Sequence, residues 1–591
     1  MPSRFALFIV LASLCLGQNT AHQQITLDPQ TLSRYAGAYE MPSGADMLIT
    51  LENHQLFSKL GNQPAIPIFA ESKTVFFTKV VNAELEFTGA DDRGRPTELI
   101  LHQNGRNITF KRLDDAEAKL LADAAADFAK RLKHQTPAAG SEAALGKLIE
   151  GLRQGKPDYD SMMAGFAEIT RDRLPQIQSM IGKLGATTTI HFKGVGPGGA
   201  DIYLVGFENG ALESRIWLGV HGKIDNANFR PGVLPATAAS LRPHLPEVDS
   251  VISAALARRP VGSVTAGVIA GKELIWSKSY GYADMEKKTP ADTDTVYRIG
   301  SITKMFTAVM LEQLVEAGKV HLSDPVEKYF PEVNAVQGRY ANAPPITLIQ
   351  LATHTSGLGR EPDDAEKYVT GAVADWEKTL IAALPHTHYI LEPGTQFSYS
   401  NIGYAILGAA LSRAAGEPYT TYIPTHIFEP LGMNHSALEL NPQILPHLAK
   451  GYQVMGPGGE VDSETPQREN ETGRGYKVPN GAIYTTVGDL SRFAAFLMGN
   501  GPESVLKTAS LDRIQNQLIV PADIGLTSGY GIGFQVERHD DLVAFGHGGA
   551  VAGYTSMLVM NRAKKIGVIV FSNGAANPSS LAQQALDILS R

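Results

Sequence analysis

The sequence of 591 residues predicts a multidomain α+β protein in which two small domains precede a large C-terminal one. Three observations carry this prediction. Residues 26–113 alternate apolar and polar side chains as strands do, and residues 114–235 are first helical and then strand-like in pattern. From residue 245 to residue 591, strands at both ends enclose mostly helical sequence, which predicts an antiparallel sheet flanked by helices, plus a helical lobe.

The composition limits the classes of protein to consider. The chain is 43% hydrophobic and 19% charged, as ordinary globular proteins are. Its net charge of −8 and the lack of a basic run argue against nucleic acid as a partner. No apolar run reaches membrane-spanning length, so no integral membrane segment is expected once an export signal is removed.

The first residues have the pattern of such a signal, over residues 1–17. Arg4 supplies a positive charge, Phe5 to Leu16 form an apolar run, and Cys15 and Gly17 place small residues at the −3 and −1 positions for cleavage. Because Cys15 is the chain's one cysteine, cleavage after Gly17 would leave no disulfide and no thiol nucleophile. Leu14 fits poorly before a lipidated cysteine. The product is therefore expected to be secreted or periplasmic, without a lipid anchor.

The first domain, residues 26–113, is predicted to be all-β. Leu85 and Phe87 alternate with glutamates, which is the period of a half-buried strand. Asn104-Gly105 lies between two apolar runs, and this pair is a strong hairpin signal because both central turn residues need positive φ.

The second domain, residues 114–235, is predicted to contain three helices followed by a small sheet that begins near Thr187. Its loop Gly194-Val-Gly196-Pro-Gly-Gly199 matches the sequence pattern G-x-G-x-x-G of a dinucleotide-binding loop. That site needs a helix N-terminus after the glycines, whereas a strand follows here, so we interpret the loop as a plain turn. The domain resembles the nuclear-transport-factor-like fold, and no chemistry is assigned to it.

The C-terminal domain is expected to follow a linker at Pro243 to Pro246. A helix and two strands open it, and strands close it again, so we expect its two ends to pair in one sheet. The expected elements are a helix at Val248 to Ala257 and strands at Ser263 to Ala270, Leu274 to Tyr282, Gly531 to Val536, Leu542 to Phe545, Thr555 to Met560 and Ile566 to Ser572.

A catalytic pair is predicted at Ser301 and Lys304. Both lie in the first turn of an expected buried helix, because apolar residues recur at helical spacing as far as Val315 and Gly318 is a stop signal. Residues i and i+3 share a helix face, so the lysine amine can lie beside the serine hydroxyl. Lysine serves as a base only if burial or nearby positive charge keeps part of it neutral. The Ser301 amide at the helix start can hold a developing oxyanion.

Two later motifs add to this pair. In Tyr399-Ser400-Asn401, a phenol near a lysine ammonium can have its pKa lowered and can pass protons, while the Asn401 amide can accept from Lys304 and donate to a substrate carbonyl. The other motif is Gly546-His547-Gly548-Gly549-Ala550. Its glycines Gly548 and Gly549 would let a substrate backbone lie against a strand. The Ala550 amide is a candidate second oxyanion donor.

His547, in the second of these motifs, is predicted to place a proton donor or a titratable charge across the cleft from Tyr399.

The three motifs in this order resemble those of the serine β-lactamase and penicillin-binding-protein family, in its class C, D-aminopeptidase and esterase branch. The resemblance covers residues 245–591 and implies that Ser301 is the acylated nucleophile, Lys304 its base partner and Tyr399 the proton shuttle, with the Ser301 and Ala550 amides as the oxyanion hole. Three further segments support the resemblance: Leu351–Leu358, Glu429–Met433 and Gly481–Tyr484. The all-β segment resembles the small lipocalin-like barrels appended to some of these hydrolases, although those barrels are commonly C-terminal.

The third motif departs from the family pattern, because many members carry Lys-Thr-Gly where this chain has His547-Gly548-Gly549. The lysine and threonine of those members engage a substrate carboxylate. A histidine is only partly protonated near pH 7, and Gly548 has no hydroxyl. Tight recognition of a C-terminal carboxylate is therefore not expected, and esterases and D-residue amidases fit the change better.

We therefore expect an exported serine hydrolase, without metal or cofactor, that forms an acyl-enzyme with small esters or with peptides and amides that contain D-residues. Two alternatives stay open: a penicillin-binding D-Ala-D-Ala carboxypeptidase or β-lactamase, and a catalytically silent binding protein of the same fold. A small molecule or peptide is the expected partner, and the sequence does not define an oligomeric state.

Overall fold

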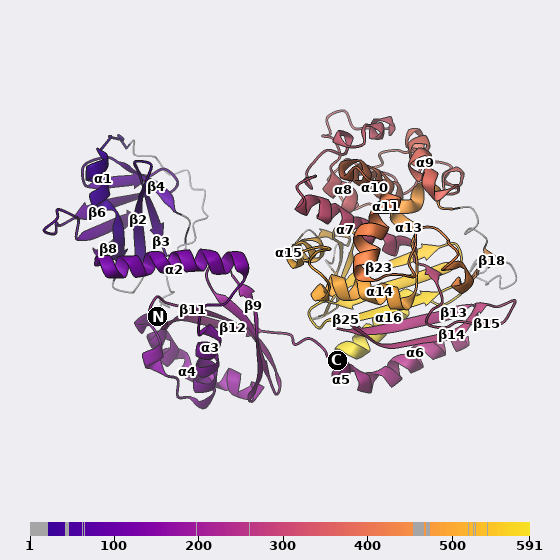
Figure 1. Cartoon of the computed structure of the whole chain (residues 1–591), viewed down its shortest axis with the longest axis horizontal. Coiled ribbons are helices and arrows are strands. Elements are labelled where there is room, and N and C mark those ends of the chain that lie inside the picture. The colour runs from indigo at the N-terminus through magenta and orange to yellow at the C-terminus, as the bar shows by residue number, and fades with distance from the viewer. Residues whose placement is uncertain are drawn as a thin grey trace. The chain divides into compact units, whose positions relative to one another are not determined.

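The computed structural model describes residues 22–41, 46–61, 63, 65–196, 198–258, 261–452, 466–467, 473–517, 519–523, 525, 527–539 and 542–591. The predicted export signal at residues 1–17 lies outside the described residues. The chain divides into two units, Met1–Leu234 and Pro235–Arg591 (Figure 1). Within the described ranges, no helix is both long enough and apolar enough to cross a membrane.

The first unit begins with a short helix, α1 (Pro29–Tyr35), and a closed barrel of eight antiparallel strands. The barrel closes where β1 pairs with β8, with Tyr39 opposite Arg112. The predicted hairpin is confirmed, because Asn104 and Gly105 join β7 to β8 with φ of 53° and 72°. The strands are β1 (Gly37–Glu40), β2 (Asp46–Glu52), β3 (Gln55–Leu60), β4 (Ile66–Ala70), β5 (Val75–Thr78), β6 (Ala83–Thr88), β7 (Glu98–Gln103) and β8 (Arg106–Arg112).

The same unit continues with three helices and a four-stranded antiparallel sheet, as the sequence predicts. The sheet has the order β12-β11-β10-β9, and its inner face packs on α3 and α4. The glycine loop at residues 194–199 joins β9 to β10, so a strand does follow it. The elements are α2 (Asp115–His134), α3 (Ser141–Gln154), α4 (Ala164–Leu184), β9 (Thr187–Val195), β10 (Asp201–Phe207), β11 (Gly210–Leu218) and β12 (Ile224–Pro231).

The second unit is built on a nine-stranded antiparallel sheet that joins its two ends. β13 (Ser263–Ala270) pairs with β25 (Ile566–Ser572), which confirms the expected closure. The sheet order is β15-β14-β13-β25-β24-β23-β22-β21-β20. The other strands are β14 (Glu273–Asp284), β15 (Thr289–Pro290), β20 (Val520–Pro521), β21 (Ser528–Tyr530), β22 (Gln535–His539), β23 (Leu542–Val551) and β24 (Tyr554–Asn561).

The expected linker at Pro243 to Pro246 is wrong. This stretch forms a 3-10 turn, Arg242–His244, that runs directly into α6 (Leu245–Arg258). Both prolines are compatible with helix here, because proline is tolerated in the first turn, where its missing N–H has no partner to lose. α6 packs beside α16 (Pro578–Ser590) in a hydrophobic cluster with one face of the sheet.

The other face of the sheet carries the helical lobe (Figure 1). Its helices are α7 (Thr303–Glu316), α8 (Leu348–Ala352), α9 (Trp376–Ala383), α10 (Asn401–Ala415), α11 (Tyr419–Ile423), α12 (Glu429–Leu431), α13 (Val478–Gly481), α14 (Val487–Ala495) and α15 (Thr508–Asp512). Two-stranded ladders join β16 (Tyr297–Arg298) to β19 (Tyr484–Thr485), and β17 (Gly451–Tyr452) to β18 (Pro466–Gln467).

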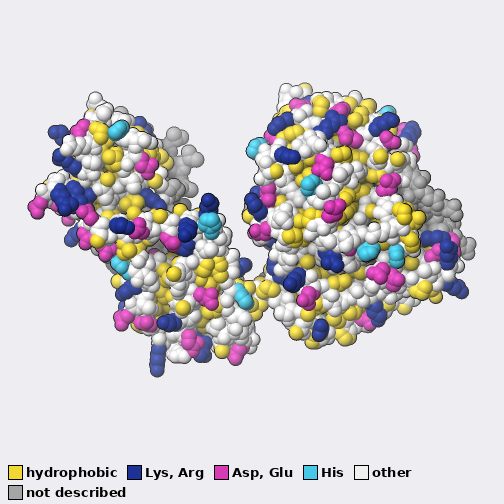
Figure 2. Space-filling model, in the orientation of Figure 1, with side chains coloured by type: hydrophobic (Ala, Val, Ile, Leu, Met, Phe, Trp, Pro, Cys, Tyr) yellow, Lys and Arg dark blue, Asp and Glu magenta, His cyan; other side chains and the backbone are white. Residues whose placement is uncertain are grey.

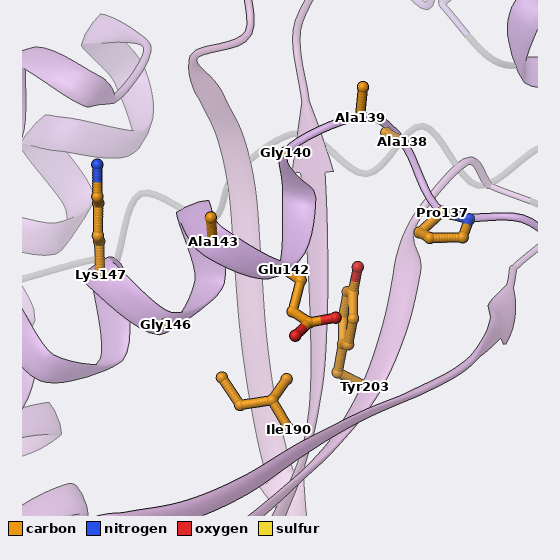
Figure 3. A pocket seen from close by; sticks show the side chains of 10 residues that line it. All are labelled: Pro137, Ala138, Ala139, Gly140, Glu142, Ala143, Gly146, Lys147, Ile190 and Tyr203. Atoms are coloured by element: carbon orange, nitrogen blue, oxygen red, sulfur yellow. The ribbon is translucent and has the colours of Figure 1, made fainter.

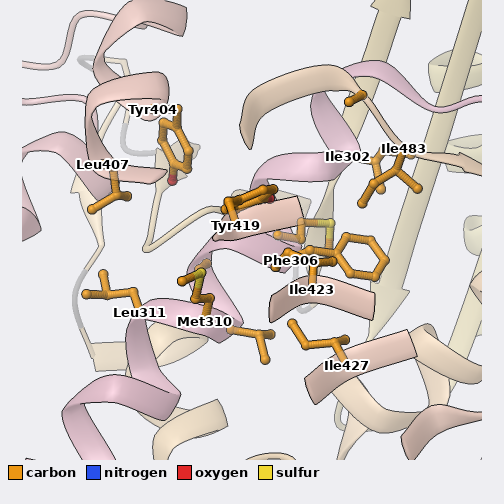
Figure 4. Close-up of a cluster of buried hydrophobic side chains, with 14 of the residues drawn as sticks. Ile302, Phe306, Met310, Leu311, Tyr404, Leu407, Tyr419, Ile423, Ile427 and Ile483 are labelled. Carbon is orange, nitrogen blue, oxygen red and sulfur yellow. The ribbon is translucent and has the colours of Figure 1, made fainter. Parts of the chain in front are cut away.

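Helix α7 is the centre of this unit, and it is buried on every side. Every residue from Thr303 to Glu312 is buried, as is typical of a helix that is surrounded by protein instead of lying on a surface. Phe306 stacks on Phe493 with ring centroids 3.7 Å apart and meets Phe428 edge-on. Figure 4 shows Phe306 and Met310 within this cluster, among side chains from α11 and the segment after it.

Figure 2 shows basic and acidic side chains interspersed over the visible face of each unit, with apolar side chains scattered between them.

We predict that Phe306→Ala destabilises the second unit by about 3–5 kcal/mol, because it leaves a cavity beside Phe493 in a core that is already closely packed. Urea unfolding monitored by tryptophan fluorescence measures the change. Leu445→Ala is the control, since Leu445 is 54% exposed and its truncation should cost less than about 1 kcal/mol. Equal effects of the two substitutions would contradict the placement of α7 in the core.

Candidate active site

The start of α7 brings Ser301 and Lys304 together. Ser301 lies in a 3-10 turn, Gly300–Ile302, that continues into the helix, and the Lys304 Nζ is 3.0 Å from the Ser301 Oγ. Lys304 is 0% exposed, whereas Ser301 is partly exposed. The helix ends at Glu316, and Gly318 has a φ of 67°, which fits the predicted stop.

Two asparagines hold the lysine amine. Lys304 Nζ donates to the Asn401 Oδ1 over 2.8 Å and to the Asn480 carbonyl oxygen over 3.3 Å. Asn480 also donates from its Nδ2 to the backbone carbonyl of Asn401 over 3.0 Å. Asn401 is the first residue of α10, which Ser400 caps by accepting from the Gly403 amide. The predicted contact between Asn401 and Lys304 is therefore present.

Burial favours the neutral form of Lys304. Loss of water around the ammonium lowers the pKa of Lys304 well below its ordinary value, and Arg360, Lys477 and Arg474 lower it further while Glu361 raises it. A neutral amine has two N–H groups and one lone pair. The carbonyl oxygens of Asn401 and Asn480 can only accept, so they take the two N–H groups. The lone pair is then left for the Ser301 hydroxyl, the one neighbour in this set that can donate.

Tyr399 differs from the expectation in its acidity. Burial raises the pKa of Tyr399 to about 12, and its hydrogen bond with Ser301 offsets only part of that effect. The expected lowering of this pKa is wrong because burial disfavours the phenolate by more than Ser301 and Arg360 favour it. The Lys304 Nζ lies 4.8 Å from the Tyr399 ring centroid. Lys304 can thus serve as the base and Tyr399 as the protonated acid.

His354 positions the loop that carries Tyr399. Its buried imidazole lies 4.2 Å from the Tyr399 ring, between centroids, and its Nδ1 accepts from the Ser400 amide over 3.0 Å. Burial also lowers the pKa of His354 well below its ordinary value, so the ring is neutral. The imidazole therefore has a structural role at this loop, as a hydrogen-bond acceptor for Ser400.

Strand β23 lies directly against the turn that holds Ser301. A Cβ atom at Gly300 would lie 2.9 Å from the Ala550 nitrogen, and one at Gly549 would lie 1.9 Å from the Ile299 carbonyl oxygen. Gly549 is therefore required for the approach of two backbones, whereas Gly548 makes no comparably close contact. The approach places the amides of Ser301 and Ala550 on adjoining segments, as an oxyanion hole needs.

His547 lies inside the protein and carries no charge near neutral pH, in contrast to the expected titratable charge. Burial lowers the pKa of His547 to about 3. Its Nδ1 donates to the Gly548 carbonyl oxygen over 2.5 Å, and its Nε2 accepts from the Tyr530 hydroxyl over 2.9 Å. Its ring centroid is 6.2 Å from that of Tyr399. The imidazole therefore braces β23 and β21, and it supplies no cation to a substrate.

Glu361 belongs to this site, and the sequence analysis missed it. Its Oε1 accepts from the Asn401 Nδ2 over 2.7 Å, and this bond turns the Asn401 Oδ1 toward Lys304. Burial raises the pKa of Glu361, but Lys477 at 3.1 Å and the Tyr476 and Asn401 hydrogen bonds outweigh burial and lower it. Its position in the sequence could have indicated it, because Glu361 lies shortly after the family-like segment Leu351–Leu358.

Two other features of the described residues do not belong to this site. In the barrel, His22, Glu71 and Glu84 have ligand atoms within 4.8 Å of one another, and a His22–Glu71 hydrogen bond of 2.9 Å accounts for much of that geometry. In the α+β part, a pocket of about 640 Å³ is lined by α3, β9, β10 and the segment before α3 (Figure 3). In this pocket Tyr203 is hydrogen bonded to Ser141 over 2.6 Å, and none of the predicted site residues lines it.

Comparison with known proteins identifies the family. The family model described as "Beta-lactamase" matches residues 248–590, and a model described as "Domain of unknown function (DUF3471)" matches residues 21–113. The first match covers more than half of the chain, so this chain belongs to the beta-lactamase family. Family membership, together with the site geometry, is consistent with a serine hydrolase.

Individual relatives and solved structures agree with this assignment. "Beta-lactamase-like protein 2" of Dictyostelium discoideum is 31% identical over 58% of this chain, and "Protein flp" of Staphylococcus aureus strain MW2 is 26% identical over 55% of it. The matched part spans 62% of the length of each relative. The octameric penicillin-binding protein homologue from Pyrococcus abyssi is 29% identical with a TM-score of 0.51, over 58% of this chain and 77% of that one. A class C beta-lactamase, 19% identical with a TM-score of 0.50 over 60% of this chain and 98% of that one, shows the same fold.

We predict that Glu361→Gln moves the acidic limb of the pH profile for Ser301 acylation to lower pH. The Glu361 carboxylate raises the pKa of Lys304, so removing its charge lowers that pKa further. Activity that depends on neutral Lys304 is lost as the pH falls through this pKa, and the loss then occurs at a lower pH. Rates of acylation by an activated aryl ester, measured from pH 4 to pH 9, give the profile.

Glu366→Gln is the matched control for this prediction, because Glu366 is exposed and lies five residues further along the same loop. Its profile should coincide with that of the unmodified protein. A limb that stays in place in Glu361→Gln, or that moves to higher pH, would contradict the coupling between Glu361 and Lys304.

Proposed function

We propose that this protein is a serine hydrolase that works through an acyl-enzyme. The observation that carries the proposal is the 3.0 Å contact between the Ser301 Oγ and a buried Lys304 Nζ whose N–H groups face two carbonyl oxygens. Lys304 takes the Ser301 proton as the Oγ attacks an ester or amide carbonyl. The amides of Ser301 and Ala550 hold the resulting oxyanion.

Tyr399 carries the second proton transfer in this proposal. As a phenol whose pKa is raised to about 12, Tyr399 donates its proton to the leaving group. Lys304, which has taken the Ser301 proton, then passes that proton to Tyr399. In deacylation Lys304 and Tyr399 act in reverse. They take a proton from a water molecule, which attacks the acyl carbonyl. The bond from the carbonyl carbon to the Ser301 Oγ then breaks, and a proton returns to that oxygen. Asn401 and Glu361 keep Lys304 in position throughout.

Small esters and D-residue amides are the substrates that this site fits best. The neutral, buried His547 gives the third motif no cation with which to hold a C-terminal carboxylate, which weighs against a carboxypeptidase or an efficient β-lactamase. We further propose that the protein is exported, on the pattern of residues 1–17, and that the barrel and the α+β part are accessory to the hydrolase.

We predict that brief exposure to a simple penicillin or to p-nitrophenyl acetate leaves one acyl adduct on the protein and none on Ser301→Ala. Intact-mass spectrometry measures the adduct, and circular dichroism checks that the variant is folded. An adduct with the ester but not with the penicillin would support the esterase and amidase assignment. A long-lived penicillin adduct would instead favour a penicillin-binding enzyme.

The same experiment can contradict the proposal. If neither reagent labels the folded protein, or if both label Ser301→Ala as fully as the unmodified chain, Ser301 is not the nucleophile. A catalytically silent protein of this fold would then be the better description.

A further inference from the structure

We infer that the barrel of the first unit binds a divalent transition-metal ion, and that zinc is the ion its ligands fit best. The ligands are His22, which is the first of the described residues, Glu71 and Glu84. Their ligand atoms all lie within 4.8 Å of one another. The inference does not depend on the proposed function, because Ser301 and Lys304 belong to the second unit.

The two glutamates lie on neighbouring parts of the barrel. Glu71 is in the turn between β4 and β5, where its amide donates to the Val75 carbonyl oxygen over 2.9 Å. Glu84 is on β6 between Ala83 and Leu85, which both fill the barrel core, so its own side chain points outward. The backbone of each glutamate is therefore fixed by the strand pairing of the barrel.

His22 is held against the same outer face by the segment that follows it. The Ile25 amide donates to the Ala70 carbonyl oxygen over 2.8 Å, which attaches this segment to the end of β4. The imidazole stacks on Phe77 with ring centroids 4.5 Å apart and an angle of 12° between the planes. Phe77 is opposite Glu84 in the pairing of β5 with β6, so the imidazole lies beside that glutamate.

One imidazole nitrogen faces both carboxylates. The His22 Nδ1 is 2.9 Å from the Glu71 Oε2 and 3.9 Å from the Glu84 Oε1. The first distance is that of a hydrogen bond, but the second is too long for one, so hydrogen bonding does not account for Glu84. Zinc binds these ligand types at about 2.0–2.2 Å, which in a tetrahedron separates the ligand atoms by about 3.4 Å. The two observed distances lie on either side of that value, and small side-chain rotations bring all three atoms onto one ion.

The two carboxylates carry more negative charge than their neighbours match. Within the described part of the chain, neither Glu71 nor Glu84 forms an ion pair with a lysine or arginine. Lys79, which follows β5, instead donates to Gln24 over 2.9 Å and lies over the Phe69 ring. A protonated imidazole could match one of the two charges, whereas a divalent ion matches both.

The set of donor atoms selects among metal ions. One imidazole nitrogen with two carboxylate oxygens suits zinc and its neighbours in the transition series. Calcium and magnesium prefer oxygen ligands alone, and more of them. Three protein ligands leave the fourth position of a tetrahedral zinc ion to water. The side chains of Glu71 and Glu84 are 34% and 41% exposed, so that position can face solvent.

The role of the ion at this site is structural. It joins the segment that begins at His22 to the turn between β4 and β5 and to β6. It therefore opposes local opening of that segment, since opening would break two metal bonds as well as the stack on Phe77.

Zinc titration of the chelator-treated protein tests the inference. The sample is the full chain without its predicted export signal and without a polyhistidine tag, and calorimetry measures the binding. We expect one zinc site per chain that His22→Gln and Glu84→Gln each weaken by about tenfold or more. Magnesium at the same concentration should not compete for it. No zinc binding to the unmodified protein, or equal affinity in both variants, overturns the inference.

His426→Gln is the matched control. His426 also lies 2.9 Å from a glutamate, Glu417, and its ring centroid is 4.2 Å from that of Tyr422. It shares the pairing and the aromatic contact of His22, but it has an ion-pair contact with one carboxylate only among the described residues. Zinc affinity in this variant should equal that of the unmodified protein.

Hydrogen exchange locates the ion without any substitution, and so keeps the test valid if a variant loses its fold. Zinc should slow exchange at the Ile25 amide of the unmodified protein by about fivefold or more, because the ion holds the segment that this amide attaches to Ala70. An exchange rate that is the same with and without zinc overturns the inference, and the His22–Glu71 contact is then a hydrogen bond alone.

Discussion

The site depends on the burial of one ammonium group. Lys304 is 0% exposed at the start of a helix that is surrounded by protein, and removal from water makes its charged form costly. The nearby cations act in the same direction, and the one carboxylate among these groups, Glu361, limits the shift. A neutral lysine whose two N–H groups face carbonyl oxygens has its lone pair directed at Ser301. Burial likewise keeps Tyr399 a protonated phenol, so Lys304 is the candidate base and Tyr399 the candidate acid.

The sheet supplies the rest of the geometry by joining distant parts of the sequence. β13, near the start of the second unit, pairs with β25 near its end, and β23 then lies against the turn of Ser301. The absence of a side chain at Gly549 lets the two backbones meet, while Ser556 on β24 holds the Ile299 carbonyl over 2.9 Å. The proposed oxyanion hole thus depends on the strand order more than on any single side chain.

Much of this could be predicted from the sequence, because it depends on local pattern. The buried helix after Ser301, the hairpin at Asn104-Gly105 and the closing strands all follow from periodicity and turn chemistry. The acidities of Tyr399 and His547 could not be predicted, because they depend on burial by segments that are remote in the sequence. The proline-marked linker was mistaken for a similar reason. A proline near the start of a helix and a proline in a linker have the same local sequence, and only packing distinguishes them.

The most direct test is a pH titration of Lys304 itself. Carbon NMR on protein labelled at the lysine Cε detects the titration. The signal that is absent from Lys304→Arg identifies the residue. We predict that this signal titrates well below the ordinary lysine pKa of 10.5, so that a substantial fraction of Lys304 is neutral at physiological pH. Titration near 10.5, together with the exposed lysines, would mean that Lys304 is an ammonium at neutral pH, and it would contradict the role of this residue as the base.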